Sequence, residues 1–459
     1  MKQGGERARA VDVVCPAELT AEERGRVEDM ARRVFEAMYC PDLGRVDIRL
    51  HENGQPYFIE LNPLPSLHPV ASLMTAAHTC GLEYKDVMRL IVRSAAKRFR
   101  LPLRTARARP ESDATRPTLR QLGVPTGRMD PGVHNAITDV KGVKVGHLTR
   151  REDDVPVPGT NDTTSVRTGV TAILPGGSDA FRRRVVAGGY VLNGVGEMAG
   201  LTQAMEWGLI ETPIMLTNSL SVGRVLHGVT SYMVRRHNEI GDHEDVVLPV
   251  VGEADDSFLN DARVGTASGQ DAIKAIEATR DGPVPQGSVG AGCGMITCDF
   301  AGGIGTSSRV FRIGEQTFAL GALVLSNFGR MVNLTVDGRV IGRDLDPMFE
   351  AGARRQRSYG SVIVVLATDV PLLSHQLGRI AKRAALGLGR VGSHAAATSG
   401  EIILAFTTAN RVPRTATMTG KFRSLRYVPD AYVDTLYEAA IEATEEAVLN
   451  AIFCSGGME

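Results

Sequence analysis

The residues that could carry chemistry lie in a glycine-rich segment, GPVPQGSVGAGCGM, which runs from Gly282 to Met295. Gly287 has no Cβ, so its carbonyl group is open to attack by the hydroxyl of Ser288, and a strained turn could help to drive the resulting N-to-O acyl shift. Hydrolysis of that ester would leave Ser288 as a new N-terminus. Its α-amine, with a pKa of about 7.7 to 8.0, could then act as the base for its own hydroxyl.

Two other interpretations of this segment stay open at the level of residues. Backbone N–H groups of dense glycines can cradle a phosphate, but Gly290, Gly292 and Gly294 alternate and lack the GxGxxG spacing. Alternating small residues instead predict a strand that packs closely against another backbone. On the residues alone, this packing strand with an inert Ser288 is favoured over self-cleavage.

Other standard motifs are missing from the sequence. It has no GxxxxGK[ST], GxSxG or HExxH, and no SxxK that opens a helix. His237 and His243 are six residues apart, which does not place both on one helix face, so we interpret them as surface histidines and not as a metal site. The six cysteines lack CxxC spacing, which favours reduced thiols.

The composition of the chain limits the classes of protein to which it can belong. The 459 residues allow two or three domains, and 52 basic residues balance 52 acidic ones. A net charge of zero argues against nucleic acid as a partner. No apolar run approaches the roughly 18 residues of a membrane span, and no apolar stretch follows Met1, so we expect a cytoplasmic protein without a membrane partner.

The first hundred residues predict a helix at 19–38, with a Thr20–Glu23 capping box, then a hairpin around Asn53-Gly54 and a second helix at 82–97. Residues 99–117 are rich in arginine and proline and are predicted to link a segment at 1–98 to a domain at 118–459.

The larger segment mixes short β runs with helical patterns. The β runs are at 140–145, 170–174, 317–325, 361–367 and 401–408, and the helices at 372–388 and 431–453. Strands and helices interspersed in about 340 residues predict one domain of α/β (α+β) layers.

Several motifs in this segment occur in an order that resembles a known family. They are NAITDVKGVKVGH from Asn135, RTGVTAILP from Arg167, LNGVGE from Leu192, LTNSLSVG from Leu216, LND from Leu259, GSVGAGCGM from Gly287, and the stretch from Ser393 to Asn410. Together they resemble the DmpA/BapA family of self-cleaving serine hydrolases, the L-aminopeptidase/D-esterase and β-peptidyl aminopeptidase group. The resemblance implies an αββα sandwich of the Ntn-hydrolase-like type with its own connectivity.

The resemblance also implies roles for residues. Autoproteolysis would separate Gly287 from Ser288 and make Ser288 the nucleophile of the smaller chain. Tyr190 and Asn260 match the family's oxyanion-binding tyrosine and asparagine, and Asn218 is a competing candidate for the asparagine. A second serine, Ser326, would hydrogen-bond the amine or hydroxyl of Ser288.

The sequence departs from the family pattern at three points. Some members have a carboxylate two residues after the second serine, where this chain has Phe328, so the supporting acid is missing or comes from elsewhere, for example Glu401. Cys293 stands where the family commonly has threonine. Glu197 could recognise a substrate amine, although a buried, paired carboxylate is an equal alternative.

The first hundred residues resemble a different family. RVDIR from Arg45 and YFIELNP from Tyr57 are similar to the C-terminal lobe of ATP-grasp ligases of the D-alanine-D-alanine ligase type. There Asp47, Glu60 and Asn62 would hold Mg²⁺ at nucleotide phosphates. No lysine-bearing adenine cleft or glycine-rich phosphate loop precedes residue 19. We therefore expect a partial ATP-grasp lobe, a remnant or the tail of a fusion, that uses Mg²⁺ and ATP only if completed.

The leading hypothesis is a hydrolase that releases N-terminal residues from small peptides, amides or esters through an acyl-enzyme on Ser288, without a cofactor. An acyltransferase with the same nucleophile is the alternative among enzymes, and a scaffold with an uncut chain is the alternative from another class. L-, D- and β-amino acid substrates stay open, although the ligase-like segment suggests a D-amino acid or cell-wall peptide. The resemblance suggests a homo-oligomer of αβ units.

Overall fold

The computed structural model describes residues 14–68, 71–99, 116–177, 179–349, 360–414 and 422–456. The chain divides into two compact units, Met1–Asp113 and Ala114–Glu459. The predicted linker at 99–117 spans this division, and its residues 100–115 lie outside the described part. No helix among the described residues is long and apolar enough to cross a membrane.

The N-terminal unit consists of helices around a small hairpin. Its elements are α1 (Ala21–Ala37), β1 (Arg45–Leu50), β2 (Pro56–Asn62), α2 (Ser72–Thr79) and α3 (Tyr84–Arg98). Thr20 and Glu23 form the predicted capping box of α1, and β1 pairs antiparallel with β2 as expected. The predicted helix at 82–97 corresponds to α3, whereas α2 was not predicted, because eight residues span barely two turns and give little periodic signal.

The C-terminal unit contains two large sheets among its described residues. The six-stranded sheet has the order β12-β13-β14-β15-β5-β7, and the five-stranded sheet has the order β3-β4-β8-β9-β6. The strands of the first are β12 (Gly303–Ile313), β13 (Gln316–Asn327), β14 (Gly360–Thr368), β15 (Ser399–Pro413), β5 (Arg183–Gly194) and β7 (Leu209–Ile210). Those of the second are β3 (Lys144–Pro156), β4 (Thr163–Leu174), β8 (Ile214–Asn218), β9 (Val250–Ala254) and β6 (Met198–Ala199), and a separate small pair is formed by β10 (Ile296–Thr297) and β11 (Phe300–Ala301).

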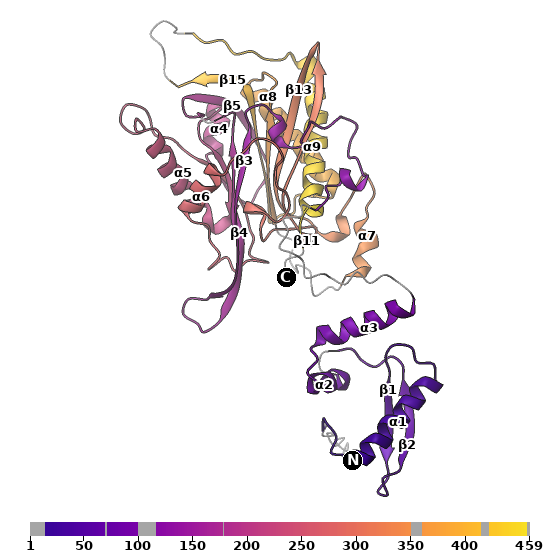
Figure 1. The fold of residues 1–459 in the computed structure, drawn as a ribbon. Helices are drawn as coiled ribbons and strands as arrows, with labels where there is room; N and C mark the ends of the chain where they lie inside the picture. Colours follow the sequence, from indigo (N-terminus) through magenta and orange to yellow (C-terminus); the bar gives the residue numbers. More distant parts are fainter. Residues whose placement is uncertain are drawn as a thin grey trace, which may run out of the picture. The chain divides into compact units, whose positions relative to one another are not determined.

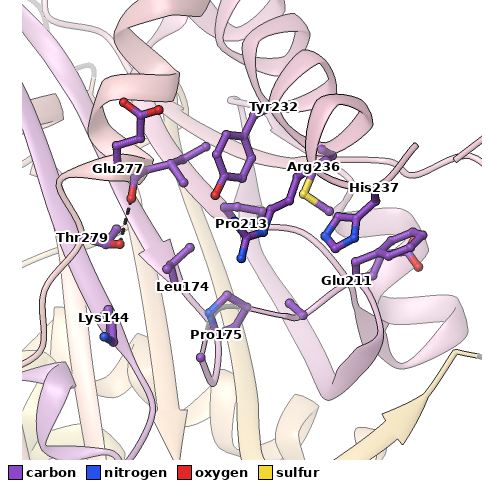
Figure 2. A pocket seen from close by; sticks show the side chains of 15 residues that line it. Lys144, Leu174, Pro175, Glu211, Pro213, Tyr232, Arg236, His237, Glu277 and Thr279 are labelled. Atoms are coloured by element: carbon purple, nitrogen blue, oxygen red, sulfur yellow. Dashed lines mark hydrogen bonds between the residues drawn. The ribbon is translucent and has the colours of Figure 1, made fainter. Parts of the chain in front are cut away.

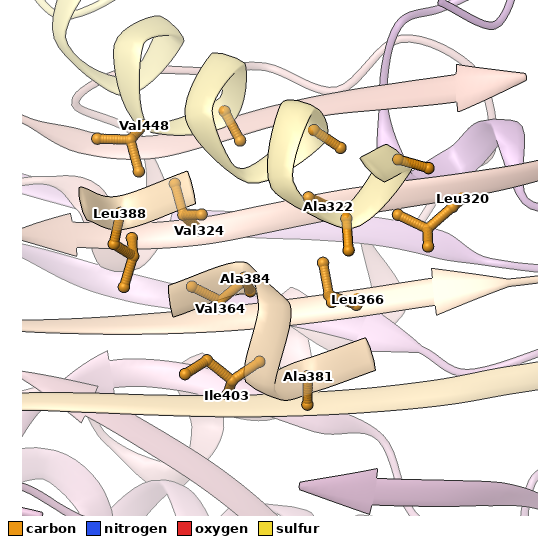
Figure 3. Close-up of a cluster of buried hydrophobic side chains, with 14 of the residues drawn as sticks. Leu320, Ala322, Val324, Val364, Leu366, Ala381, Ala384, Leu388, Ile403 and Val448 are labelled. Carbon is orange, nitrogen blue, oxygen red and sulfur yellow. The ribbon is translucent and has the colours of Figure 1, made fainter. Parts of the chain in front are cut away.

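Two helices cover the outer face of the six-stranded sheet. They are α8 (Ser374–Val391) and α9 (Val433–Phe453). Figure 3 shows Ala381 and Ala384 of α8 packed over Val364 of β14 and Ile403 of β15, while Val448 of α9 belongs to the same buried cluster as Val324 of β13. Alternate residues of each strand face these helices and the residues between them face the other sheet. Both faces of the strands are therefore buried, so the strands read as continuous apolar runs.

The five-stranded sheet carries its own helices, α5 (Val222–Arg236) and α6 (Gly269–Glu277), on the side away from the other sheet (Figure 1). A further buried cluster joins the sheets face to face, with Ile173 and Ile214 from one and Leu323 and Ile363 from the other. The layers are therefore helix, sheet, sheet, helix, and the predicted αββα sandwich is confirmed. Shorter helices α4 (Leu201–Trp207) and α7 (Gly342–Leu345) lie in connections.

One predicted strand is wrong, and another begins later than predicted. The glycine-rich segment after Ser288 is no strand but a 3₁₀ turn, η4 (Gly290–Gly292), because Gly290 and Gly294 adopt φ of 53° and 91°, in the left-handed region. The run at 140–145 begins pairing only at Lys144, and residues before it form turns.

Candidate active site

The Gly287–Ser288 peptide lies beside the edge of the six-stranded sheet. Gly287 forms an antiparallel bridge to Ile304 of β12: its N–H donates to the Ile304 carbonyl at 2.6 Å and its carbonyl accepts from the Ile304 N–H at 2.9 Å. The N–H of Val289 donates to the same Gly287 carbonyl at 2.8 Å, which closes a three-residue turn around Ser288. Two backbone donors therefore converge on the carbonyl that the Ser288 hydroxyl would attack.

Position 287 has room for glycine alone. Its φ is 86°, and a Cβ there would lie 2.4 Å from the carbonyl oxygen of Cys454, just after α9 ends. The end of α9 thus presses directly on the peptide bond before Ser288. A side chain at this position would push the bond away from its two donors.

Ser288 itself is buried, with 3% of its surface exposed. Its hydroxyl is 3.5 Å from the Gly302 carbonyl oxygen, a weak hydrogen bond, and its own carbonyl accepts from Arg151 at 2.6 Å. The Ser455 hydroxyl donates to the same Gly302 carbonyl at 2.6 Å. The serine is held by its backbone, while its hydroxyl is only loosely engaged.

The turn after Ser288 is anchored to the other sheet. The N–H of Gly290 donates to Thr149 at 2.7 Å, and that of Ala291 donates to Thr171 at 3.1 Å. His147 contacts Thr171 at 2.9 Å through Nδ1, and burial lowers the pKa of this histidine to about 4. The imidazole of His147 is therefore neutral at pH 7, and it contacts the threonine that anchors the turn.

Ser326 does not form the predicted hydrogen bond with Ser288, whose hydroxyl contacts the Gly302 carbonyl instead. Ser326 lies on β13 and is paired with Gly303 of β12. The carbonyl of the preceding residue, Gly302, faces Ser288. The Ser326 hydroxyl is 2.8 Å from the hydroxyl of Thr297, and both side chains are fully buried. Sequence reasoning missed Thr297, which approaches Ser326 only through the fold.

Asn218 and Asn260 are brought together by a carboxylate that sequence reasoning also missed. Nδ2 of each asparagine donates to Asp256, at 3.0 Å in both cases. Asp256 lies against the turn after Ser288, since a Cβ at Gly294 would be 3.1 Å from its Cβ. Burial raises the pKa of Asp256 to about 6, although hydrogen bonds from Thr168 and both asparagines act to lower it.

The amide groups of these asparagines are already engaged. Nδ2 of Asn260 also donates to the Gly265 carbonyl at 2.9 Å, and its Oδ1 accepts from the Arg167 N–H at 3.0 Å. Nδ2 of Asn218 donates to the Gly265 carbonyl as well. Neither amide therefore has a free N–H group for an oxyanion. For the oxyanion of self-cleavage, which forms on the Gly287 carbonyl, the N–H groups of Val289 and Ile304 are better placed.

Tyr190 is not brought to Ser288. It lies on β5 with its ring 5.7 Å from the Lys382 amine of α8 and packs with the core under the helices. Val289, next to Ser288, packs instead with the core between the sheets. The cause is the alternation of side chains on β5, where Ala187 points between the sheets and the even-numbered Tyr190 points to the helices.

The two other acids suggested by sequence do not reach the nucleophile. Glu401 is buried on β15, separated from Ser326 by Val362 of β14, so two strand spacings lie between them. It lines a small cavity with Phe328 and accepts from Ser399, and burial raises its pKa. Glu197 is exposed.

In the N-terminal unit, the hairpin aligns the predicted magnesium ligands. Asp47 pairs with Glu60 and Arg45 with Asn62 across β1 and β2, so all four occupy one face. The Arg45 guanidinium lies 2.9 Å from Asp47 and 3.4 Å from Glu60. These oxygen donors suit Mg²⁺ in type, but Arg45 occupies the carboxylates, and no cluster of three His, Cys, Asp or Glu side chains arranged for a metal occurs in the described residues.

Comparison with known proteins agrees with this division of the chain. Residues 5–93 match the model described as D-ala D-ala ligase C-terminus. The D-alanine–D-alanine ligase of Paraburkholderia phytofirmans is 33% identical over 81 residues, which cover 18% of this chain and 26% of the ligase. The N-terminal unit therefore corresponds to about a quarter of such a ligase.

The C-terminal unit has relatives along most of its length. The β-peptidyl aminopeptidase BapA of Sphingosinicella microcystinivorans is 38% identical over 352 residues, covering 74% of this chain and 86% of that protein. The solved L-aminopeptidase D-Ala-esterase/amidase of Ochrobactrum anthropi, described as a variant of the Ntn-hydrolase fold, aligns with a TM-score of 0.67 and 38% identity over 74% of this chain and 91% of that one. The model of peptidase family S58 matches residues 135–459, so the chain belongs to this family of peptide-bond hydrolases.

Proposed function

We propose that the chain is a serine aminopeptidase and amidase that makes its own nucleophile by cleavage between Gly287 and Ser288. The observation that carries this proposal is the Gly287 carbonyl, which accepts two backbone N–H groups, from Val289 and Ile304, beside the Ser288 hydroxyl. Donors aimed at an oxygen that becomes negative stabilise the transition state of acyl transfer.

Self-cleavage balances as two steps. In the first, Oγ of Ser288 bonds to the carbonyl carbon of Gly287, the C–N bond breaks, and the proton from the hydroxyl goes to the released amine. In the second, water hydrolyses the ester, which leaves a carboxylate on Gly287 and restores the Ser288 hydroxyl. The product is a chain that starts at Ser288 with a free α-amine.

In turnover, Oγ of Ser288 attacks the carbonyl of the substrate's N-terminal residue, and the α-amine of Ser288 takes the hydroxyl proton. The amine or alcohol leaves with that proton, and water then frees the acyl group. Nucleophile and base belong to one residue, so we propose that the peptidase needs no metal or cofactor. The substrates would be small peptides, amides or esters. The names of the relatives support three kinds of substrate: β-amino acid substrates, L-amino acid substrates, and esters or amides of D-alanine.

The relatives give no support to an acyltransferase or to a scaffold. We propose that the N-terminal unit takes no part in peptide hydrolysis and uses Mg²⁺ and ATP only together with the rest of a ligase. What supports this is the engagement of Asp47 and Glu60 by Arg45 and the quarter of the ligase length that the unit represents.

We further propose that the enzyme works as a homo-oligomer of αβ units in the cytoplasm. Val191, Leu192 and Val195 are exposed at and just after the end of β5. Exposed apolar side chains close together in the chain support self-association. All six cysteines are free thiols, which supports a reducing compartment.

The test is hydrolysis of L-, D- and β-alanyl p-nitroanilides by the wild type and by Ser288→Ala. We expect turnover of at least one substrate by the wild type, with or without a chelator, and a loss of at least about a thousandfold in the variant. Ser231→Ala, on α5, is the control and should leave the rate unchanged. Equal rates in wild type and Ser288→Ala would contradict the proposal, and turnover of L substrates alone would end the idea of a D-amino acid preference.

A further inference from the structure

The C-terminal unit contains a pocket that is separate from the turn of Ser288. It has a volume of about 480 Å³, within the range of small-molecule sites, and lies between α5, α6 and the loop after β4. Figure 2 shows the side chains that surround it. None of its lining residues belongs to the turn of Ser288, and the peptidase chemistry proposed above uses none of them.

The pocket has an apolar wall. Leu174, Pro175 and Pro213 form one side, and the buried ring of Phe181 forms another. Phe181 is fixed from two directions, because the His237 ring lies 4.5 Å from it and the Arg414 guanidinium lies 4.1 Å from it. These two contacts hold the Phe181 ring in place at the pocket wall.

Polar groups converge on the same space. Tyr232 and Arg236 are four residues apart on α5, and Figure 2 shows the hydroxyl of one and the guanidinium of the other directed into the pocket. His237 follows and is 6% exposed, yet its Nδ1 has no hydrogen-bond partner. The nearest carboxylate oxygen, on Glu239, is 3.9 Å away.

The charged residues that line the pocket are two cations, Lys144 and Arg236, and two carboxylates, Glu211 and Glu277. Neither Lys144 nor Arg236 forms an ion pair with any residue that the structure describes. The carboxylate of Glu211 is bound by Arg414 at 2.5 Å. The carboxylate of Glu277 points away from the cavity in Figure 2. Arg236, a cation without an ion pair among the described residues that is directed into a cavity with an apolar wall, favours an anion with an apolar body.

We propose that this pocket is a binding site for a small organic carboxylate. The planar guanidinium of Arg236 takes the carboxylate, with the Tyr232 hydroxyl beside it. Nδ1 of His237 gains its missing partner from a polar group of the ligand, and the ligand's apolar body packs against Phe181 and Pro213. The proposal concerns binding alone and does not depend on the activity of Ser288.

Hippurate, which joins a carboxylate, an amide and a phenyl ring, is a suitable probe, and hippuramide is its uncharged counterpart. We would titrate both by calorimetry into the full-length wild type and into Ser288→Ala. We expect hippurate to bind one site per αβ unit of the wild type and one site per uncut chain of Ser288→Ala, and hippuramide to bind at least tenfold more weakly. Equal binding of the two, no binding of hippurate, or loss of binding in Ser288→Ala would overturn the proposal.

Two variants locate the site. Arg236→Gln should weaken hippurate binding at least tenfold, whereas Arg235→Gln, the adjacent residue of α5 that does not line the pocket, should leave it unchanged. Thermal unfolding of each variant verifies that it folds. Tyr232→Phe should weaken binding severalfold without loss of volume. Equal effects of the two arginine variants would contradict the site, and displacement of hippurate by an equal concentration of inorganic phosphate would contradict its preference for an organic carboxylate.

Discussion

At the scale of single residues, the site depends on how each peptide group around Ser288 is held. Gly287 supplies a carbonyl with two donors, and Ser288 supplies a loosely bound hydroxyl. Two buried side chains of the surroundings, Thr297 and Asp256, carry no motif of their own. Each is joined to a predicted residue, Thr297 to Ser326 and Asp256 to both asparagines.

Gly287→Ala should stop or greatly slow self-cleavage. The new Cβ would stand 2.4 Å from the Cys454 carbonyl oxygen, so the scissile peptide must move off its donors. Gly282→Ala is a matched control, since Gly282 has a similar φ of 89° but open space around its Cβ position. It should lose about 1 to 2 kcal/mol of stability and still cleave. Band intensities on denaturing gels over time measure both, and cleavage of Gly287→Ala at the wild-type rate would contradict the geometry.

Asp256 should make stability depend on pH. Its pKa is raised to about 6, so the folded chain holds the proton more tightly than the unfolded one. The contribution of protonated Asp256 to the free energy of unfolding is fully present below about pH 4, and it is lost as the pH rises through about 6.

Urea unfolding of the wild type and Asp256→Asn tests this. Between pH 4 and 7 the unfolding free energy of the wild type should fall relative to the variant by up to about 3 kcal/mol, the equivalent of about two pKa units. A difference that stays constant over this range would show that Asp256 has an ordinary pKa.

At the scale of elements, the position of α9 determines the space at the site, because the carbonyl of Cys454, just after the helix ends, packs against Gly287. A buried ion network fixes this helix. Arg309 of β12 bonds Glu442 and Glu446 of α9, each at 2.9 Å, and Arg120 bonds Glu446 at 3.0 Å. Burial alone would raise the pKa of Glu446, but the two arginines and Asn135 lower it.

Arg309→Met should destabilise the chain by about 3 to 5 kcal/mol, because it leaves Glu442 buried without its cation and Glu446 with Arg120 alone. Arg312→Met, on the same strand but exposed, should change stability by no more than about 0.5 kcal/mol. Guanidinium unfolding in a Ser288→Ala background keeps all chains uncut and comparable. Equal stability of the two variants would mean that the network does not hold α9.

Local patterns predicted several of these elements. The capping box at Thr20, the hairpin at Asn53-Gly54 and the apolar faces of α8 and α9 are all encoded within a few residues. The segment after Ser288 was mistaken for a strand, because alternating glycines suit a tight turn equally well. Tyr190 was misplaced because pattern alone does not tell which face of a buried strand meets which layer.

The long-range contacts could not be predicted at all. Arg309 and Glu446 are 137 residues apart, and Asn218 and Asp256 are 38 apart, so no local pattern joins them. Ser288 was identified by the Gly-Ser peptide and by the resemblance of the surrounding motifs. The geometry of its carbonyl donors required the bridge between Gly287 and β12.

At the scale of the whole molecule, two compact units share one chain. The C-terminal unit contains the complete αββα sandwich and every residue of the candidate peptidase site. The N-terminal unit contains the hairpin of a ligase lobe. The peptidase account therefore rests on one event within the C-terminal unit, the break between Gly287 and Ser288.

The most direct test is intact-mass analysis of purified protein, with N-terminal sequencing, for the wild type and Ser288→Ala. The account predicts two chains from the wild type, one that ends at Gly287 and one that begins at Ser288, and a single uncut chain from the variant. An uncut wild-type chain, or a variant cut at the same bond, would contradict it.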